Sequence, residues 1–171
     1  MIRTALLLVD LQKWIVGLDL SPISGPTVVE RCAAMSDHSR STGTTVAFIR
    51  YLRHGPMTPD DEWTPRLMPS ADDLVVSKGG IDAFAGTDLH HRLAELDVAQ
   101  VFIAGIATAH GVAATAQTAR RLGHRTAVII DAVASLNLAE HEAATAVLES
   151  SGVGLVTMSV VEVLLSEQSP A

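Results

Sequence analysis

The sequence is short of several features that would assign a protein to a particular class. Its only cysteine in 171 residues is Cys32, so no internal disulfide can form, and we expect a cytoplasmic location. Only 18% of the residues are charged, and the formal net charge is -7 with Lys and Arg dispersed, so neither nucleic acid nor an anionic membrane is an expected partner. The apolar start "MIRTALLLVDLQ" is too short for a signal peptide or a membrane span.

The sequence is rich in apolar residues, which make up 48% of the chain. A chain of this length can bury a full core, so we predict a single domain over residues 1–171. The low share of charged residues leaves few charges to cover the surface. We therefore expect a homodimer or a larger homo-oligomer.

Short apolar runs rich in β-branched residues recur along the chain. They are near-continuous rather than alternating, which is typical of strands buried on both faces of a parallel sheet. The six runs lie at residues 5–10, 44–51, 73–78, 99–105, 125–131 and 154–159.

Helical patterns separate most of these runs, so strand and helix alternate and the pattern predicts a doubly wound α/β sheet. A loop over residues 52–72, with four prolines, interrupts the alternation, and a loop this long in a compact domain is usually functional. The predicted helices cover residues 26–43, 87–97, 111–123 and 138–152.

Ligands of such sheets bind beyond the carboxyl ends of the strands, so the polar residues there are the candidates. The first strand ends at Asp10, with Gln12 after it, and the third ends at Lys78. Because Asp10 follows "LLLV", burial should raise its pKa unless a cation such as Lys78 compensates. The alternatives are a helix cap or turn role for Asp10 and a solvated charge for Lys78.

The turn "GIATAHG" after the fourth strand has no Ser, Cys or Lys at the place where an α/β enzyme keeps its nucleophile. The amides around Gly111 and Val112 begin the next helix and should be free to stabilise an anion or a developing oxyanion. The alternative is a small-residue turn that serves helix packing.

Three segments together resemble the isochorismatase-like hydrolase superfamily: "ALLLVDLQ", "SKGGIDAFAGTDLHHRL" and "GIATAHGVAATAQTARRLGHRTAVIIDAVAS". The matching order and spacing extend over nearly the whole chain. The resemblance implies a three-layer, Rossmann-like fold whose six parallel strands are ordered 3-2-1-4-5-6. We predict no cofactor.

Most members of that superfamily use an Asp, a Lys and a Cys as a triad. By resemblance, the Asp and Lys correspond to Asp10 and Lys78, and the Cys position falls on Gly111. The resemblance also implies a cis peptide bond between Ile106 and Ala107. Cys32 lies in the middle of a predicted helix on its apolar face, so it is expected in the core rather than as a substitute nucleophile.

The isochorismatases proper also have Gly at the Cys position, and they hydrolyse a vinyl ether with release of pyruvate. This chemistry needs no protein nucleophile. By resemblance, Asp10 is the general acid, Lys78 positions substrate and Asp10, and Gly111 leaves room for a small-molecule substrate.

Several further residues are candidates for substrate contact. The predicted set comprises Gln12, Arg50, Trp63, Phe84, Ala107, Thr108 and His110. Arg50 could hold a carboxylate in bidentate fashion, and Trp63 and Phe84 could wall an apolar pocket. The alternatives are a solvated arginine, aromatic side chains that anchor a loop, and a histidine at a helix end.

Relatives of the nicotinamidase type bind a metal through this loop. Here the loop offers His54, Asp60 and Asp61 without the spacing of that site, so we predict no metal.

Two readings compete with a vinyl-ether hydrolase. One is an amide hydrolase or a lyase that uses water directly, and the other is a binding or assembly protein whose catalytic turn decayed. An Asp–Lys pair argues against decay, because a buried charge pair without a use is costly and replaceable. The sequence also leaves open whether Gly111 was introduced by engineering.

Overall fold

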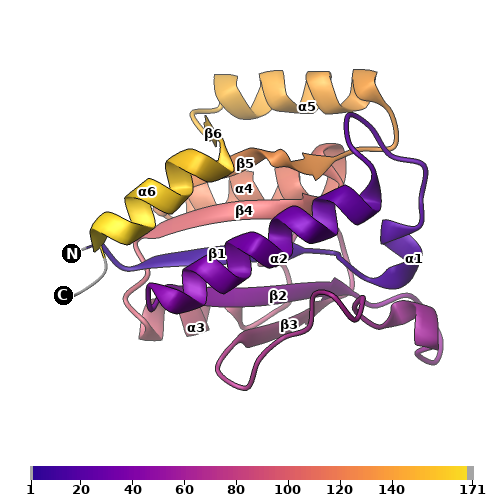
Figure 1. Ribbon diagram of the computed structural model, residues 1–171, viewed down its shortest axis with the longest axis horizontal. Helices are drawn as coiled ribbons and strands as arrows, with labels where there is room; N and C mark the ends of the chain where they lie inside the picture. The colour runs from indigo at the N-terminus through magenta and orange to yellow at the C-terminus, as the bar shows by residue number, and fades with distance from the viewer. Residues whose placement is uncertain (1, 169–171) are drawn as a thin grey trace.

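Parallel strands form a six-stranded sheet in the computed structural model, which describes residues 2–168 (Figure 1). Their order is β3-β2-β1-β4-β5-β6, which confirms the predicted order. The strands are β1 (Thr4–Val9), β2 (Thr45–Tyr51), β3 (Leu74–Lys78), β4 (Gln100–Ile106), β5 (Arg125–Ala134) and β6 (Gly154–Val156).

Strand β1 lies at the centre of the sheet, where every one of its side chains is buried. Leu6 pairs with Val46 of β2 on one side and with Phe102 of β4 on the other. Its near-continuous aliphatic sequence is therefore the pattern of a strand covered on both faces.

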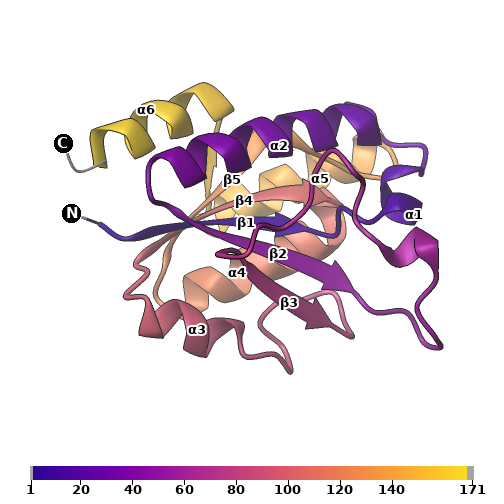
Figure 2. The same cartoon turned by 60° about the horizontal axis from the view of Figure 1, so that its bottom comes forward.

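Helices cover both faces of the sheet in two layers (Figure 2). One layer contains α1 (Lys13–Val16), α2 (Gly25–Ser41) and α6 (Met158–Gln168). The other contains α3 (Leu89–Glu95), α4 (Ala113–Arg121) and α5 (Leu138–Ser150). None of the helices in the described part of the chain is long and apolar enough to cross a membrane.

Side-chain caps explain where two of these helices begin. The Ser24 hydroxyl accepts a hydrogen bond from the Thr27 amide at 3.3 Å, and Pro26 occupies the first turn of α2. The Asn137 side chain accepts from the Glu140 amide at 2.9 Å and caps α5 in the same way.

The structure corrects several of the sequence-based elements; β5, for example, continues to Ala134 instead of ending at 131. The last strand ends at Val156 instead of 159, because Asp131 Oδ1 accepts a hydrogen bond from the Met158 amide at 2.9 Å and α6 begins there. Helices α1 and α6 were not predicted, the first because four residues are too few to show a period. A π-helical turn (Thr108–Val112) precedes α4, so the helical path begins before residue 111.

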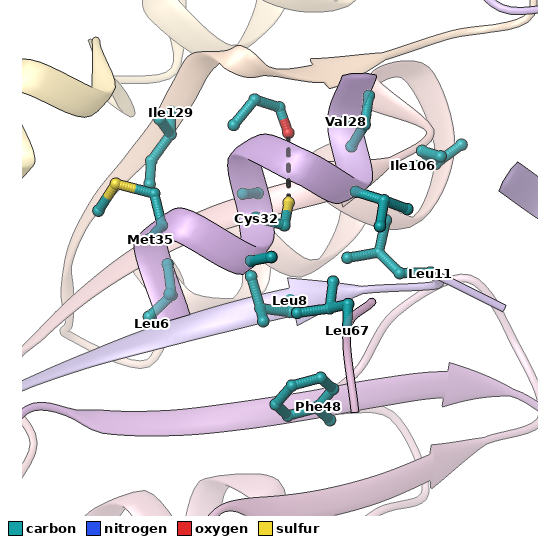
Figure 3. Close-up of a cluster of buried hydrophobic side chains, with 14 of the residues drawn as sticks. Leu6, Leu8, Leu11, Val28, Cys32, Met35, Phe48, Leu67, Ile106 and Ile129 are labelled. Carbon is teal, nitrogen blue, oxygen red and sulfur yellow. Dashed lines mark hydrogen bonds between the residues drawn. The ribbon is translucent and has the colours of Figure 1, made fainter. Parts of the chain in front are cut away.

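Cys32 lies in the core between α2 and the sheet, as predicted (Figure 3). Its side chain is fully buried, and its Sγ is 3.9 Å from the Ala132 carbonyl oxygen. Burial raises the pKa of this thiol far above its ordinary value, so Cys32 is not a nucleophile.

Candidate active site

Asp10 leaves the end of β1 in an unusual backbone conformation. Its φ of 53° is in the left-handed region, which few residues other than glycine adopt. The Asp10 amide donates a hydrogen bond to the Ile49 carbonyl at 2.9 Å, which ties this turn to β2. Strain of this kind is retained where the surrounding structure over-determines it, and such positions cluster at functional sites.

Lys78 reaches Asp10 from the end of β3, two strands away. Its Nζ lies 2.8 Å from Asp10 Oδ2, and the lysine is only 1% exposed. The same ammonium donates to the carbonyl oxygens of Gly80 at 3.1 Å and Ile81 at 3.0 Å. These three bonds use all three ammonium hydrogens. Lys78 therefore holds Asp10 and has no hydrogen left for a substrate.

The Asp10 carboxyl is poised to exchange a proton near neutral pH. Burial raises its pKa from 3.8 to about 6, and the opposing effect of Lys78 is smaller. Its second oxygen, Oδ1, is buried and has no hydrogen-bond partner within residues 2–168. Oδ1 is thus the atom that can give a proton to a bound molecule or take one from it.

The turn after β4 brings Gly111 against this pair. The peptide bond between Ile106 and Ala107 is cis, as predicted. A β-carbon at Gly111 would lie 2.9 Å from Asp10 Oδ2 and 3.3 Å from Lys78 Nζ. Any side chain at this position would therefore displace the charged groups.

The backbone of the turn is less open to an anion than the sequence predicts. The amides of His110 and Val112 both donate to the Ala107 carbonyl, at 3.0 and 3.2 Å. The expectation of a free Val112 amide is therefore wrong, because the π-helical turn begins early enough to supply its acceptor.

A cavity of about 180 Å³ lies over Asp10. Of the predicted residues, Ala107, His110 and Gly111 line it together with Asp10 and Lys78. Its remaining wall is mostly apolar and consists of Trp14, Ile15, Leu18, Tyr51, Ile81, Ile106 and Leu136. Among the described residues that line it there is no serine, threonine or cysteine, so no side chain of the kind used as an acyl-transfer nucleophile faces the cavity.

Two predicted contact residues support the cavity from outside its lining. The Gln12 amide exchanges two hydrogen bonds with the backbone of Tyr51, at 2.9 and 2.8 Å, and so fixes the end of β2. The Thr108 hydroxyl lies 2.9 Å from Nδ1 of the buried His141. This contact holds the start of the turn that contains Gly111 against α5.

Three others lie elsewhere. Trp63 packs edge-on against Phe48 in the core, with ring centroids 5.8 Å apart. The Arg50 guanidinium lies over the Trp63 ring at 5.1 Å. Phe84 stacks on His124 at 6.3 Å. None of the three lines the cavity over Asp10.

Most of the cavity wall carried no signal in the sequence. Trp14, Ile15 and Leu18 belong to or follow α1, a helix too short to be recognised. Their place directly after Asp10 was the available clue, because the chain that leaves a strand end lies beside the ligand site.

A buried acid and lysine at the carboxyl edge of a doubly wound parallel sheet, under a mostly apolar cavity, define a small-molecule enzyme of the α/β class. Residues 4–160 match the isochorismatase domain. The chain belongs to the isochorismatase family, whose members are hydrolases.

Individual relatives agree with this assignment. The chain is 31% identical to YwoC, an uncharacterized isochorismatase family protein of Bacillus subtilis, over 160 residues that cover 82% of each. An isochorismatase family protein of Burkholderia thailandensis superposes with a TM-score of 0.84 at 28% identity, over 95% of each chain. The pyrazinamidase of Pyrococcus horikoshii, solved in complex with zinc, superposes with a TM-score of 0.81 at 25% identity, over 91% of this chain and 99% of that one.

The loop of this chain does not fit a metal ion of the kind that pyrazinamidase was solved with. Within residues 2–168 no three His, Cys, Asp or Glu side chains come together in a way that could hold one. Asp61 is already bound by Arg53 Nε at 2.7 Å and by the Thr58 amide and hydroxyl, both at 2.8 Å.

Proposed function

We propose that this chain is a cytoplasmic, homo-oligomeric hydrolase that cleaves a small carboxylic substrate, a vinyl ether of the isochorismate type, without a protein nucleophile. The observation that carries the proposal is the Asp10 carboxyl. It has a pKa of about 6, and its Oδ1 has no hydrogen-bond partner within residues 2–168. None of the described residues that line its cavity is a serine, threonine or cysteine.

The reaction uses Asp10 as a general acid. Asp10 protonates the methylene carbon of the enol ether, and the adjacent carbon becomes an oxocarbenium ion. Water adds to that carbon and loses a proton, and the hemiketal then breaks its carbon–oxygen bond to release the keto acid and an alcohol. The carboxylate that remains on Asp10 is stabilised by Lys78 until it regains a proton.

The two neighbours of Asp10 fit this role. Lys78 positions the carboxyl and stabilises its ionised form, while burial keeps the pKa high enough for a protonated fraction near neutral pH. The missing side chain of Gly111 leaves space above Oδ2, where a β-carbon would come within 2.9 Å.

A second candidate function is hydrolysis of a carbon–nitrogen bond by water, with ionised Asp10 as a general base. The similarity to a pyrazinamidase over 91% of the chain favours it. The two candidates require opposite protonation states of one carboxyl, so they can be distinguished.

The test is pyruvate release from isochorismate and other enolpyruvyl ethers, run beside a panel of small amides. We expect pyruvate release that Asp10→Asn lowers by about 10²–10⁴-fold. The matched control is Asp97→Asn, because Asp97 has the same φ of 53° but is exposed and does not line the cavity. Pyruvate release that survives Asp10→Asn would disprove the mechanism, and turnover of amides alone would favour the second candidate.

A further inference from the structure

His110 shares the cavity with Asp10. It directly precedes Gly111, and its side chain lines both the cavity over Asp10 and a groove between α4 and α5. Of the described residues that line the cavity over Asp10, it is the only histidine. The cavity thus combines a carboxyl that can give a proton with an imidazole that can accept one.

Glu140, in the first turn of α5, faces this imidazole. Its Oε2 lies 3.8 Å from His110 Nε2, is buried and has no hydrogen-bond partner among residues 2–168. Its other oxygen, Oε1, accepts a hydrogen bond from Asn137 Nδ2 at 2.9 Å, while the Glu140 amide donates to Asn137 Oδ1 at 2.9 Å. The capping contact of α5 therefore fixes the carboxylate and leaves Oε2 free for the imidazole.

A carboxylate on one nitrogen of a histidine prepares the other nitrogen to act as a base. It fixes the tautomer with hydrogen on the near nitrogen, and it stabilises the imidazolium that forms when the far nitrogen takes a proton. Catalytic hydrogen bonds are often long in ligand-free structures and shorten when substrate binds, so 3.8 Å is compatible with this role.

We infer that His110 is the general base that activates water, with Glu140 as its positioning residue. The inference rests on the proposed function and deepens it, because it gives the proton of the attacking water to a second group. The Asp10 carboxylate formed in the first step then stays available for the hydroxyl proton of the hemiketal. In a chain without a nucleophile at position 111, His110 and Glu140 then supply the general base that activates water.

The proton transfers balance over one turnover. Asp10 gives its proton to the methylene carbon, and water bonds to the oxocarbenium carbon as His110 Nδ1 takes the water proton. The imidazolium next protonates the ether oxygen as the carbon–oxygen bond breaks, and the Asp10 carboxylate takes the hydroxyl proton of the hemiketal. Both residues return to their starting states, and the net reaction consumes one water.

The test compares turnover of the enolpyruvyl ether by the wild type, His110→Ala, Glu140→Gln and Asp10→Asn. We expect His110→Ala to lower kcat by about 10²–10⁴-fold, and added imidazole to restore part of it. Glu140→Gln should lower kcat by less and leave KM unchanged, because it acts through His110. The matched controls are His91→Ala and Glu95→Gln, an exposed pair on α3 at 3.3 Å, and these should leave turnover unchanged.

The outcomes distinguish the role of His110 from the proposed function. Turnover that depends on Asp10 but is unchanged in His110→Ala would overturn the role of His110 and leave the proposed function standing. A loss in His110→Ala that imidazole does not restore would mean that the side chain serves the structure and would also overturn the inference. Absence of turnover in the wild type, or turnover independent of Asp10, would overturn both proposals.

Discussion

At the scale of single residues, two opposing effects act on the pKa of Asp10. Burial favours the neutral carboxyl, whereas Lys78 at 2.8 Å favours the ionised form. Burial is the larger effect, and the resulting pKa of about 6 makes either protonation state accessible near neutral pH. The same carboxyl is therefore able to serve as an acid or a base, and the pH dependence of turnover distinguishes the two roles.

The pH profile of kcat/KM shows whether Asp10 acts as an acid or as a base. If Asp10 is the acid, the active form is protonated, so kcat/KM should fall by about tenfold per pH unit above about 6. If it is the base, the fall should occur below that pH. A profile that is flat through this region would contradict both roles, and Asp97→Asn, which changes an exposed residue, should leave the profile unchanged.

The buried pair of Asp10 and Lys78 was predictable from the sequence, but the cavity wall was not. Asp10 and Lys78 stand out because each follows an apolar strand, and strand ends of a parallel sheet converge. No sequence pattern identifies Tyr51 and Leu136, because whether a side chain lines a cavity depends on how the neighbouring elements pack. Arg50 shows the opposite problem: it is placed correctly at a strand end, yet its guanidinium lies over Trp63.

At the scale of elements, β4 depends on the backbone of Gly105. This residue has a φ of 123°, and a β-carbon there would lie 2.1 Å from the Val9 carbonyl oxygen of β1. The register between β4 and β5 shifts between Ile103 and Gly105, so the strand bends just before the turn of the site.

Gly105→Ala should therefore lower the free energy of unfolding by about 3 kcal/mol or more, through a disfavoured backbone conformation and a steric clash together. The matched control is Gly43→Ala, which has a φ of 71° but no neighbouring atom within 4 Å of the added carbon, so about 1 kcal/mol is expected. Urea denaturation measures both. Equal losses would show that the contact with Val9 does not contribute.

The sequence predicted the inner strands of the sheet well because β1, β2 and β4 are buried along most of their length, and helices with a recognisable period lie between most of the strands. It failed at the ends of elements. The last apolar run divides at Met158, where α6 begins and the Met158 amide donates a hydrogen bond to Asp131, 27 residues away in the chain. A long-range contact of this kind leaves no local pattern.

At the scale of the whole molecule, most of helix α5 is exposed. Of its 13 residues only His141 and Leu148 are buried, while Leu138 and Val147 are 48% and 52% exposed. A groove of about 400 Å³ lies between it and α4, and Ile81, which also lines this groove, is 60% exposed. An apolar surface of this kind supports the proposed self-association.

We predict that the protein sediments as a dimer or larger assembly at micromolar concentration, and that Val147→Glu shifts it toward the monomer. The matched control is Val163→Glu, which changes a 57% exposed valine on α6, on the other face of the sheet. A monomeric wild type would contradict the prediction. Dissociation by Val163→Glu alone would assign the interface to α6.

The burial of Cys32 has a practical consequence. Because this is the only cysteine in the chain and its side chain is fully enclosed, thiol-directed reagents have no competing target in the folded protein. A fluorophore or spin label attached to a newly introduced cysteine would report from that position alone. The molecule is therefore ready for spectroscopic study of its cavity without removal of a native thiol.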